Sequence, residues 1–155
     1  MTKHVITEIL GNADDFKDKV RGFDRLLVTS DERSSPHLLR ETEGGRTVRI
    51  SLPRGTELND GDVIELDGDI AVIVAAADED LFVISPNSPI EGGIAGYQLG
   101  NLHRPVRFTE NKNILTPFDP TVRDILDHVR IRYKRLMLPF VGKRYGSHKA
   151  HNHHD

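Results

Sequence analysis

Four of the last eight residues are histidines, which is the strongest compositional anomaly in this sequence of 155 residues. They are His148, His151, His153 and His154. Neutral imidazole binds nickel, zinc and copper, and a histidine-rich segment can wrap a cation without a preformed cavity. A solubilising tail or the remnant of a purification tag would carry the same residue type, but a tag is usually an unbroken run of histidines. The interrupted spacing therefore favours metal capture.

A further histidine, His103, lies at the junction between a predicted helix and the strand that follows it. A lone histidine at such a junction more often caps or packs than binds a ligand, and one imidazole cannot hold a metal tightly. If the chain dimerises about a two-fold axis running past this loop, however, the same position appears twice and supplies a pair of ligands. Such a site binds metal only through neutral imidazole, so its affinity should fall below about pH 6. Ligand softness alone would not select nickel over copper or zinc.

Composition excludes several other kinds of site. The chain has no cysteine, which removes disulfides, thiolate metal sites, iron–sulfur clusters and cysteine nucleophiles. The longest apolar run, residues 70–77, is far shorter than the roughly 20 residues of a membrane helix, and the first residues do not resemble a signal peptide. We therefore expect a cytoplasmic protein without a membrane partner.

Charge divides the chain into an acidic part and a basic part. Residues 1–100 carry 10 Lys and Arg against 19 Asp and Glu, whereas residues 101–155 carry 11 against 5. The net charge of -3 conceals this asymmetry. A basic second part could face an acidic partner or a phosphate backbone.

The elements that must position the histidines form two predicted domains of an α+β fold. Residues 1–69 read as a small antiparallel β domain, with strands separated by turn residues and a hairpin signal at Gly44-Gly45. The expected strands are 5–10, 25–30, 37–42, 47–52 and 62–66. Within 47–52, apolar and polar residues alternate as in a strand with one solvated face.

The pattern changes over residues 70–141, which read as β-α-β-β-α-β, the ferredoxin-like order. Apolar runs at 70–77 and 81–84 form one interrupted strand or a hairpin, Ser88 and Pro89 begin a helix, and a second amphipathic helix starts at Pro120. The remaining strands are expected at 104–110, 114–118 and 132–140. Residues 142–155 are polar and lack periodicity, so we expect a disordered tail until a ligand binds it.

The sequence resembles the UreE family of urease accessory proteins, which are nickel metallochaperones. The most specific feature is the segment YQLGNLH at 97–103, which matches a Tyr-x-Leu-Gly-Asn-x-His motif. Weaker features are Gly61-Asp62-Val63, Leu138-Pro139-Phe140 and the terminal histidines, and they follow the family's order along almost the whole chain.

The resemblance implies an N-terminal domain that binds protein partners and a C-terminal domain that dimerises around a surface nickel site. In that family the histidine of the motif, here His103, supplies one ligand from each protomer, and tail histidines complete the shell. Nickel would be cargo, with zinc or copper able to bind the same site, and would pass to the accessory GTPase UreG and the urease apoprotein complex. Pairing of dimers into a tetramer around one metal stays open. Two departures, Gln98 where many members have histidine and Leu102 where most have arginine, leave the principal ligand untouched.

Three other functions compete with this one. A metal-dependent hydrolase has little support, because the sequence lacks His-Glu-x-x-His, Gly-x-Ser-x-Gly and glycine-rich phosphate loops, so we expect no enzyme. RNA binding could use the cations at 130–135, but the aromatic content of 6% and the pI near 6.2 argue against a nucleic-acid partner. Nickel or zinc storage, with the tail as the whole device, remains the alternative to delivery.

Overall fold

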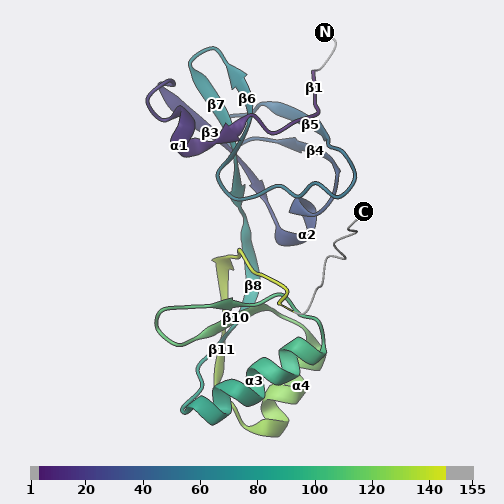
Figure 1. Cartoon of the computed structure of the whole chain (residues 1–155), viewed down its shortest axis with the longest axis vertical. Coiled ribbons are helices and arrows are strands. Elements are labelled where there is room, and N and C mark those ends of the chain that lie inside the picture. The colour runs from purple at the N-terminus through teal and green to yellow at the C-terminus, as the bar shows by residue number, and fades with distance from the viewer. Residues whose placement is uncertain (1–3, 146–155) are drawn as a thin grey trace, which may run out of the picture. The chain divides into compact units, whose positions relative to one another are not determined.

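The computed structural model describes residues 4–145 and divides the chain into two compact units, 1–78 and 79–155 (Figure 1). The predicted boundary at residue 69 falls earlier than this division. The reason is that β7 (Ile70–Ala76) pairs with β3 (Gly22–Val28) and β6 (Asp62–Asp67), so it belongs to the first unit. In the range 4–145, no helix is long and apolar enough to span a bilayer.

Unit 1 contains two sheets. The order β1-β5-β4 joins β1 (Val5–Ile6), β5 (Thr47–Ser51) and β4 (His37–Glu41), and the order β2-β6-β7-β3 adds β2 (Gly11–Asn12) to the three strands above. Both sheets are mixed, because β1 runs parallel to β5, and β3 runs parallel to β7. The expectation of a purely antiparallel domain was therefore wrong. Alternation reports which face of a strand is buried, but it does not report strand direction.

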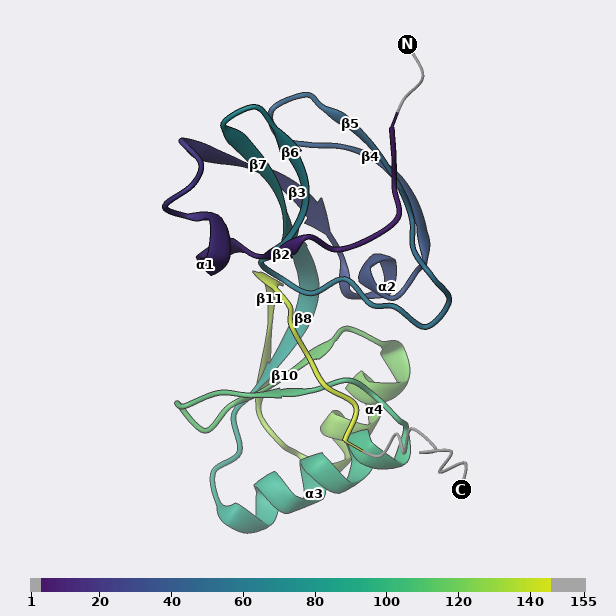
Figure 2. The same cartoon turned by 45° about the horizontal axis from the view of Figure 1, so that its top comes forward.

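Apolar residues from both sheets of unit 1 share one core. Leu26 and Val28 of β3, Val72 and Val74 of β7, and Ile50 of β5 are all buried there. Two four-residue helices that the periodicity did not predict, α1 (Ala13–Phe16) and α2 (Ser30–Arg33), interrupt the strands (Figure 2). Each begins with a capping box, from Asn12 to Asp15 and from Thr29 to Glu32.

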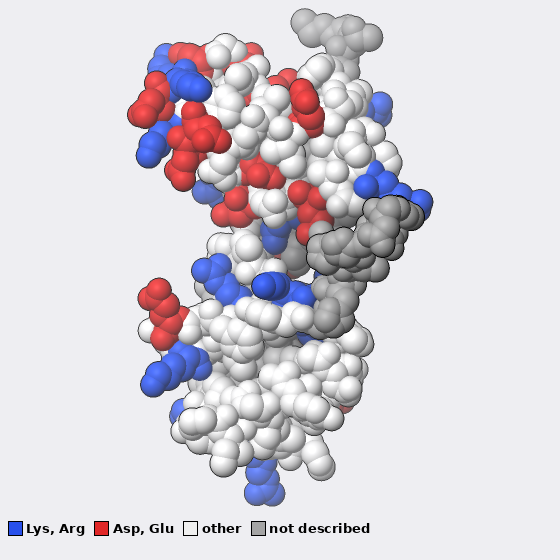
Figure 3. Space-filling model, viewed as in Figure 1, with Lys and Arg blue, Asp and Glu red and all other residues white. Residues whose placement is uncertain are grey.

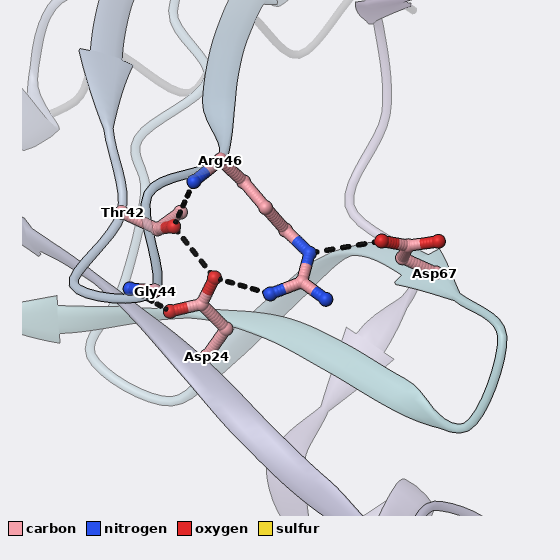
Figure 4. A network of polar contacts seen from close by, with 5 residues as sticks. All are labelled: Asp24, Thr42, Gly44, Arg46 and Asp67. Atoms are coloured by element: carbon pink, nitrogen blue, oxygen red, sulfur yellow. Dashed lines mark hydrogen bonds and ion pairs between the residues drawn. The ribbon is translucent and has the colours of Figure 1, made fainter.

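A buried carboxylate ties the β4–β5 turn to the neighbouring sheet (Figure 4). Asp24 of β3 is 6% exposed and accepts hydrogen bonds from Thr42 Oγ1 (2.5 Å), Gly44 N (2.8 Å) and Arg46 Nη1 (2.8 Å). Arg46 also donates from Nε to Asp67 at 2.9 Å. Burial alone would raise the pKa of Asp24, but the hydrogen bonds from Thr42, Arg46 and Gly44 outweigh it and hold the pKa below its ordinary value.

Unit 2 is a four-stranded sheet with two helices, in the order β8 (Asp78–Ile84), α3 (Pro89–Asn101), β9 (Arg107–Phe108), β10 (Ile114–Pro117), α4 (Pro120–Val129) and β11 (Tyr133–Pro139). The sheet order is β11-β8-β10-β9, and β10 is antiparallel to both β8 and β9. The strands β7 and β8 belong to different sheets, so the hairpin considered for the two apolar runs is not present.

Both helices cover one face of the unit 2 sheet. Ala95 and Leu99 of α3 and Leu126 of α4 share a buried cluster with Phe82 and Ile84 of β8. The alternate residue Leu81 lies in a smaller cluster with Leu115 and Phe140 on the opposite face.

Side-chain caps determine where the two helices begin. Ser88 Oγ accepts from Glu91 N at 3.1 Å and Pro89 follows at the first helical position, as predicted for α3. Asp119 caps α4 by accepting from Thr121 N at 2.8 Å. The candidate ligand His103 follows the opposite, C-terminal end of α3.

Candidate metal site at the end of helix α3

His103 lies immediately after α3, in the left-handed backbone conformation that terminates the helix. Its φ is 54°, Leu102 is the C-cap, and the hydrogen bonds from His103 N to Gly100 O and from Arg104 N to Leu99 O, both 3.0 Å, close the last turn. The hydrogen bond from Arg104 N to Leu99 O is typical of a Schellman motif. In this motif the residue with the left-handed conformation is usually glycine. A histidine here therefore carries backbone strain that a glycine would not. This termination of α3 leaves His103 exposed to solvent.

The last described residues of the chain lie beside His103. Val106 and Lys143 form an antiparallel bridge with two backbone hydrogen bonds of 2.9 Å, and Arg144 Nε donates to His103 O at 3.3 Å. The Tyr145 ring lies 5.6 Å from the Phe108 ring. Residues 142–145 thus pack on unit 2, and the prediction of a disordered tail from residue 142 was wrong for these four.

A hollow of about 380 Å³ opens next to His103. It is lined by Gly96, Gly100, His103, Arg104, Val106, Phe108, Arg144 and Tyr145. Two of these residues, Arg144 and Tyr145, were not singled out from the sequence, because only the bridge between Val106 and Lys143 brings them near His103. That bridge joins segments far apart in the chain, and its residue types give no local signal.

An ion pair secures the backbone that follows His103. Arg104 Nη2 lies 2.6 Å from Asp119 Oδ2, while the other carboxylate oxygen of Asp119 caps α4. Partial burial would raise the pKa of Asp119, but bonds from Thr121 N and Val122 N, with the charge of Arg104, lower it below the ordinary value. The carboxylate therefore stays charged at neutral pH and links the end of α3 to the start of α4.

The outer face of α3 is apolar and exposed. Ile90, Ile94 and Tyr97 are 76%, 40% and 73% exposed, and they lie on the side opposite the buried Ala95 and Leu99. A methyl group added at Gly93 or Gly96 would meet no atom of the described chain within 4 Å. Figure 3 shows this surface over α3 as a white area with charged side chains only near its margins. Contiguous exposed apolar patches are uncommon on monomeric proteins and mark interaction surfaces.

The two positions that depart from the family motif have different surroundings. Leu102 is half-buried and packs against the core of unit 2, which accounts for an apolar residue there. Gln98 is also half-buried, and nothing in the structure explains it.

Of the five predicted metal ligands, the structure places one. His103 is described, whereas His148, His151, His153 and His154 lie outside residues 4–145. Within that range no three His, Asp or Glu side chains gather into a group that could hold a metal. A metal site built on His103 would therefore need ligands from beyond the described residues of one chain.

Comparison with known proteins assigns both units. Residues 6–77 match the model for "UreE urease accessory protein, N-terminal domain", and residues 79–155 match the corresponding C-terminal domain. The chain is 34% identical over 131 residues to a urease accessory protein UreE of Geobacillus kaustophilus, covering 84% of this chain and 88% of the relative. A Nostoc relative of the same name is 35% identical over 130 residues (81% and 87% covered), and one from Corynebacterium efficiens is 28% identical over 155 residues (96% and 99%).

Proposed function

The chain belongs to the UreE urease accessory protein family, and on this premise we propose that it binds Ni(II) and delivers it for assembly of the urease active site. Membership supports a role in urease maturation, and it confirms that the chain is an accessory protein and no enzyme. We further propose that unit 2 is a ferredoxin-like domain, which its β-α-β-β-α-β order and the sheet order β11-β8-β10-β9 support.

The observation that carries the proposal is the position of His103 beside the end of the described chain. Arg144 contacts the backbone of His103, so residues 146–155 start next to the candidate ligand. An extended residue spans at most about 3.6 Å, so the three residues that link Tyr145 to His148 can span at most about 11 Å. The tail histidines can therefore reach a metal held at His103 and complete its coordination.

A dimer through α3 would supply a second His103. The exposed stripe of Ile90, Ile94 and Tyr97 runs along the helix toward His103, and the glycines beside it let two helices approach closely. A two-fold axis parallel to α3 would pair the two helices in the same direction along this stripe, and both copies of His103 would then lie at the same end of the interface. Pairing of two dimers around one ion remains a further step of the same proposal.

A site of this design suits transfer of cargo. Its imidazole ligands are exposed and separable, so an acceptor can replace them one at a time. Zinc and copper bind the same donors, and selection of nickel then depends on geometry and supply. We propose that the acceptors are the accessory GTPase UreG and the urease apoprotein complex in the cytoplasm, and that unit 1 contributes partner binding.

Nickel titration calorimetry at pH 7.5, run beside light scattering, tests the proposal. We expect about one tight nickel per dimer, lost in His103→Ala and retained in His128→Ala, which removes another exposed histidine from α4. Ending the chain at Gly146 should weaken the site without removing it. Tyr97→Glu should give monomers and lose the tight site with the interface.

Two results would contradict delivery from a dimer site. Unchanged stoichiometry and affinity in His103→Ala would remove the proposed ligand. Loss of nearly all bound nickel on ending the chain at Gly146, with no effect of His103→Ala, would instead identify storage by the tail.

A further inference from the structure

A groove runs along one flank of α3, between that helix and the β9–β10 hairpin. It consists of the hollow beside His103 and a second hollow of about 470 Å³, and Phe108 lines both. The second is lined by Pro86, Asn87, Ser88, Pro89, Gly92, Phe108, Thr109, Lys112, Asn113 and Ile114. The helix wall of the groove is formed by Gly92, Gly96 and Gly100, one turn apart, so no side chain of the helix fills it.

The charged groups that line the groove are all cationic. Arg104 and Arg144 belong to the hollow at the C-terminal end of α3, and Lys112 belongs to the hollow at its N-terminal end. In the described part of the chain, neither lining includes an Asp or Glu. Arg104 is balanced by Asp119, and the ammonium of Lys143 lies 4.8 Å from the ring of Tyr145, which lines the first hollow. The groove thus combines apolar and aromatic walls with cationic lining groups.

We propose that this groove binds an extended acidic segment of the partner protein that exchanges metal with His103. The inference rests on the proposed function, because it takes His103 as the ligand beside which the partner docks. The glycine wall lets the backbone of an extended peptide approach the helix, and Phe108 and Tyr145 offer apolar contacts to its side chains. Carboxylates of the segment pair with Lys112, and the positive charge of the groove lining steers its approach.

Charge and position favour a partner over the other two occupants that the structure allows. The segment 146–155 has one Lys and one Asp, so its charged side chains offer no acidic excess to the groove. A second copy is better matched to the outer face of α3, where Ile90, Ile94 and Tyr97 are exposed, whereas the groove lies on the flank beside it. A partner seated in the groove brings its own carboxylate oxygens next to the metal-bearing histidine.

Selection from a displayed library of random dodecapeptides on the full chain tests the inference. We expect the recovered peptides to carry more Asp and Glu than Lys and Arg. Their binding, followed by fluorescence anisotropy, should weaken with salt and fall about tenfold or more on Lys112→Glu. Lys134→Glu makes the same charge change on β11, at the opposite edge of the sheet, and should leave binding within about twofold. Phe108→Ala removes the side chain that both hollows share and should also weaken binding.

Several results would overturn the inference. Recovery of no acidic peptides, or of peptides that bind Lys112→Glu as well as wild type, would remove the charge argument. Binding that appears only when the chain ends at Tyr145 would assign the groove to the tail, and peptides that dissociate the dimer would assign it to a second copy. Nickel titration of the same variants separates the two proposals. Intact nickel binding without peptide binding defeats only this inference, whereas peptide binding without nickel binding defeats the proposed function and with it the metal exchange at this groove.

Discussion

Replacing His103 by glycine should stabilise the apoprotein while abolishing its tight nickel site. A left-handed conformation costs an ordinary L-residue about 1–2 kcal/mol, and the φ of 54° places His103 in this region. Glycine removes that cost, but its greater conformational freedom stabilises the unfolded chain by about 0.5–1 kcal/mol. The net stabilisation is therefore about 0.5–1 kcal/mol. For a domain of this size, it corresponds to a rise of about 2–8 °C in Tm.

Scanning calorimetry of metal-free protein in a chelator measures the effect, and two variants serve as controls. His103→Ala removes the same imidazole but keeps a side chain at the strained position, so its Tm should stay near that of wild type. Arg130→Gly relieves the corresponding strain at the end of α4, where φ is 58°, and should stabilise unit 2 similarly while leaving nickel binding intact. A Tm for His103→Gly at or below that of His103→Ala would refute the strain argument.

Two further variants test the polar contacts that shape each unit. Asp24→Asn should lower the free energy of unfolding by about 2 kcal/mol at pH 7, since the buried carboxylate loses its charge-assisted bonds. The pKa of Asp24 in the folded state lies below the ordinary 3.8, so wild type should lose this extra stability as the pH falls from 3.8 through the folded-state pKa. Urea unfolding that shows the same stability difference between wild type and Asp24→Asn at pH 3 as at pH 7 would contradict the prediction. Asp119→Ala should cost about 1–2 kcal/mol by removing the α4 cap and the partner of Arg104. Asp119→Asn, which can still cap, should lower Tm less, and equal losses would argue against the cap.

The elements of unit 2 were largely predictable because their signals are local. Ser88 and Pro89 begin α3, and the spacing of Val122 and Leu126 predicts the buried face of α4. The strand expected at 104–110 is only two residues long in the structure, because Val106 pairs with Lys143 and not with β10. A strand pattern reports burial and alternation, but pairing partners are chosen by the tertiary structure.

Unit 1 shows what local patterns leave out. The parallel pairing of β3 with β7 joins distant segments, so the apolar run at 70–77 could not be assigned to its domain from sequence. The helix α2 did carry a signal, the Thr29–Glu32 capping box, but four residues are too few for a periodic pattern. Likewise, the motif identified His103 from sequence. Its neighbours Arg144 and Tyr145 could not be identified in this way, because the bridge between Val106 and Lys143 brings them close only in the folded structure.

On the proposed function, a single described imidazole per protomer makes nickel affinity a property of the dimer. Binding of metal across two copies of His103 must then strengthen the α3 contact by the same factor by which that contact strengthens metal binding. Affinity falls when protomers are dilute, since the paired ligands separate with them. Whatever competes for the exposed stripe of α3 therefore weakens metal binding as well. A partner that covers this stripe could release the cargo without contacting the ion directly.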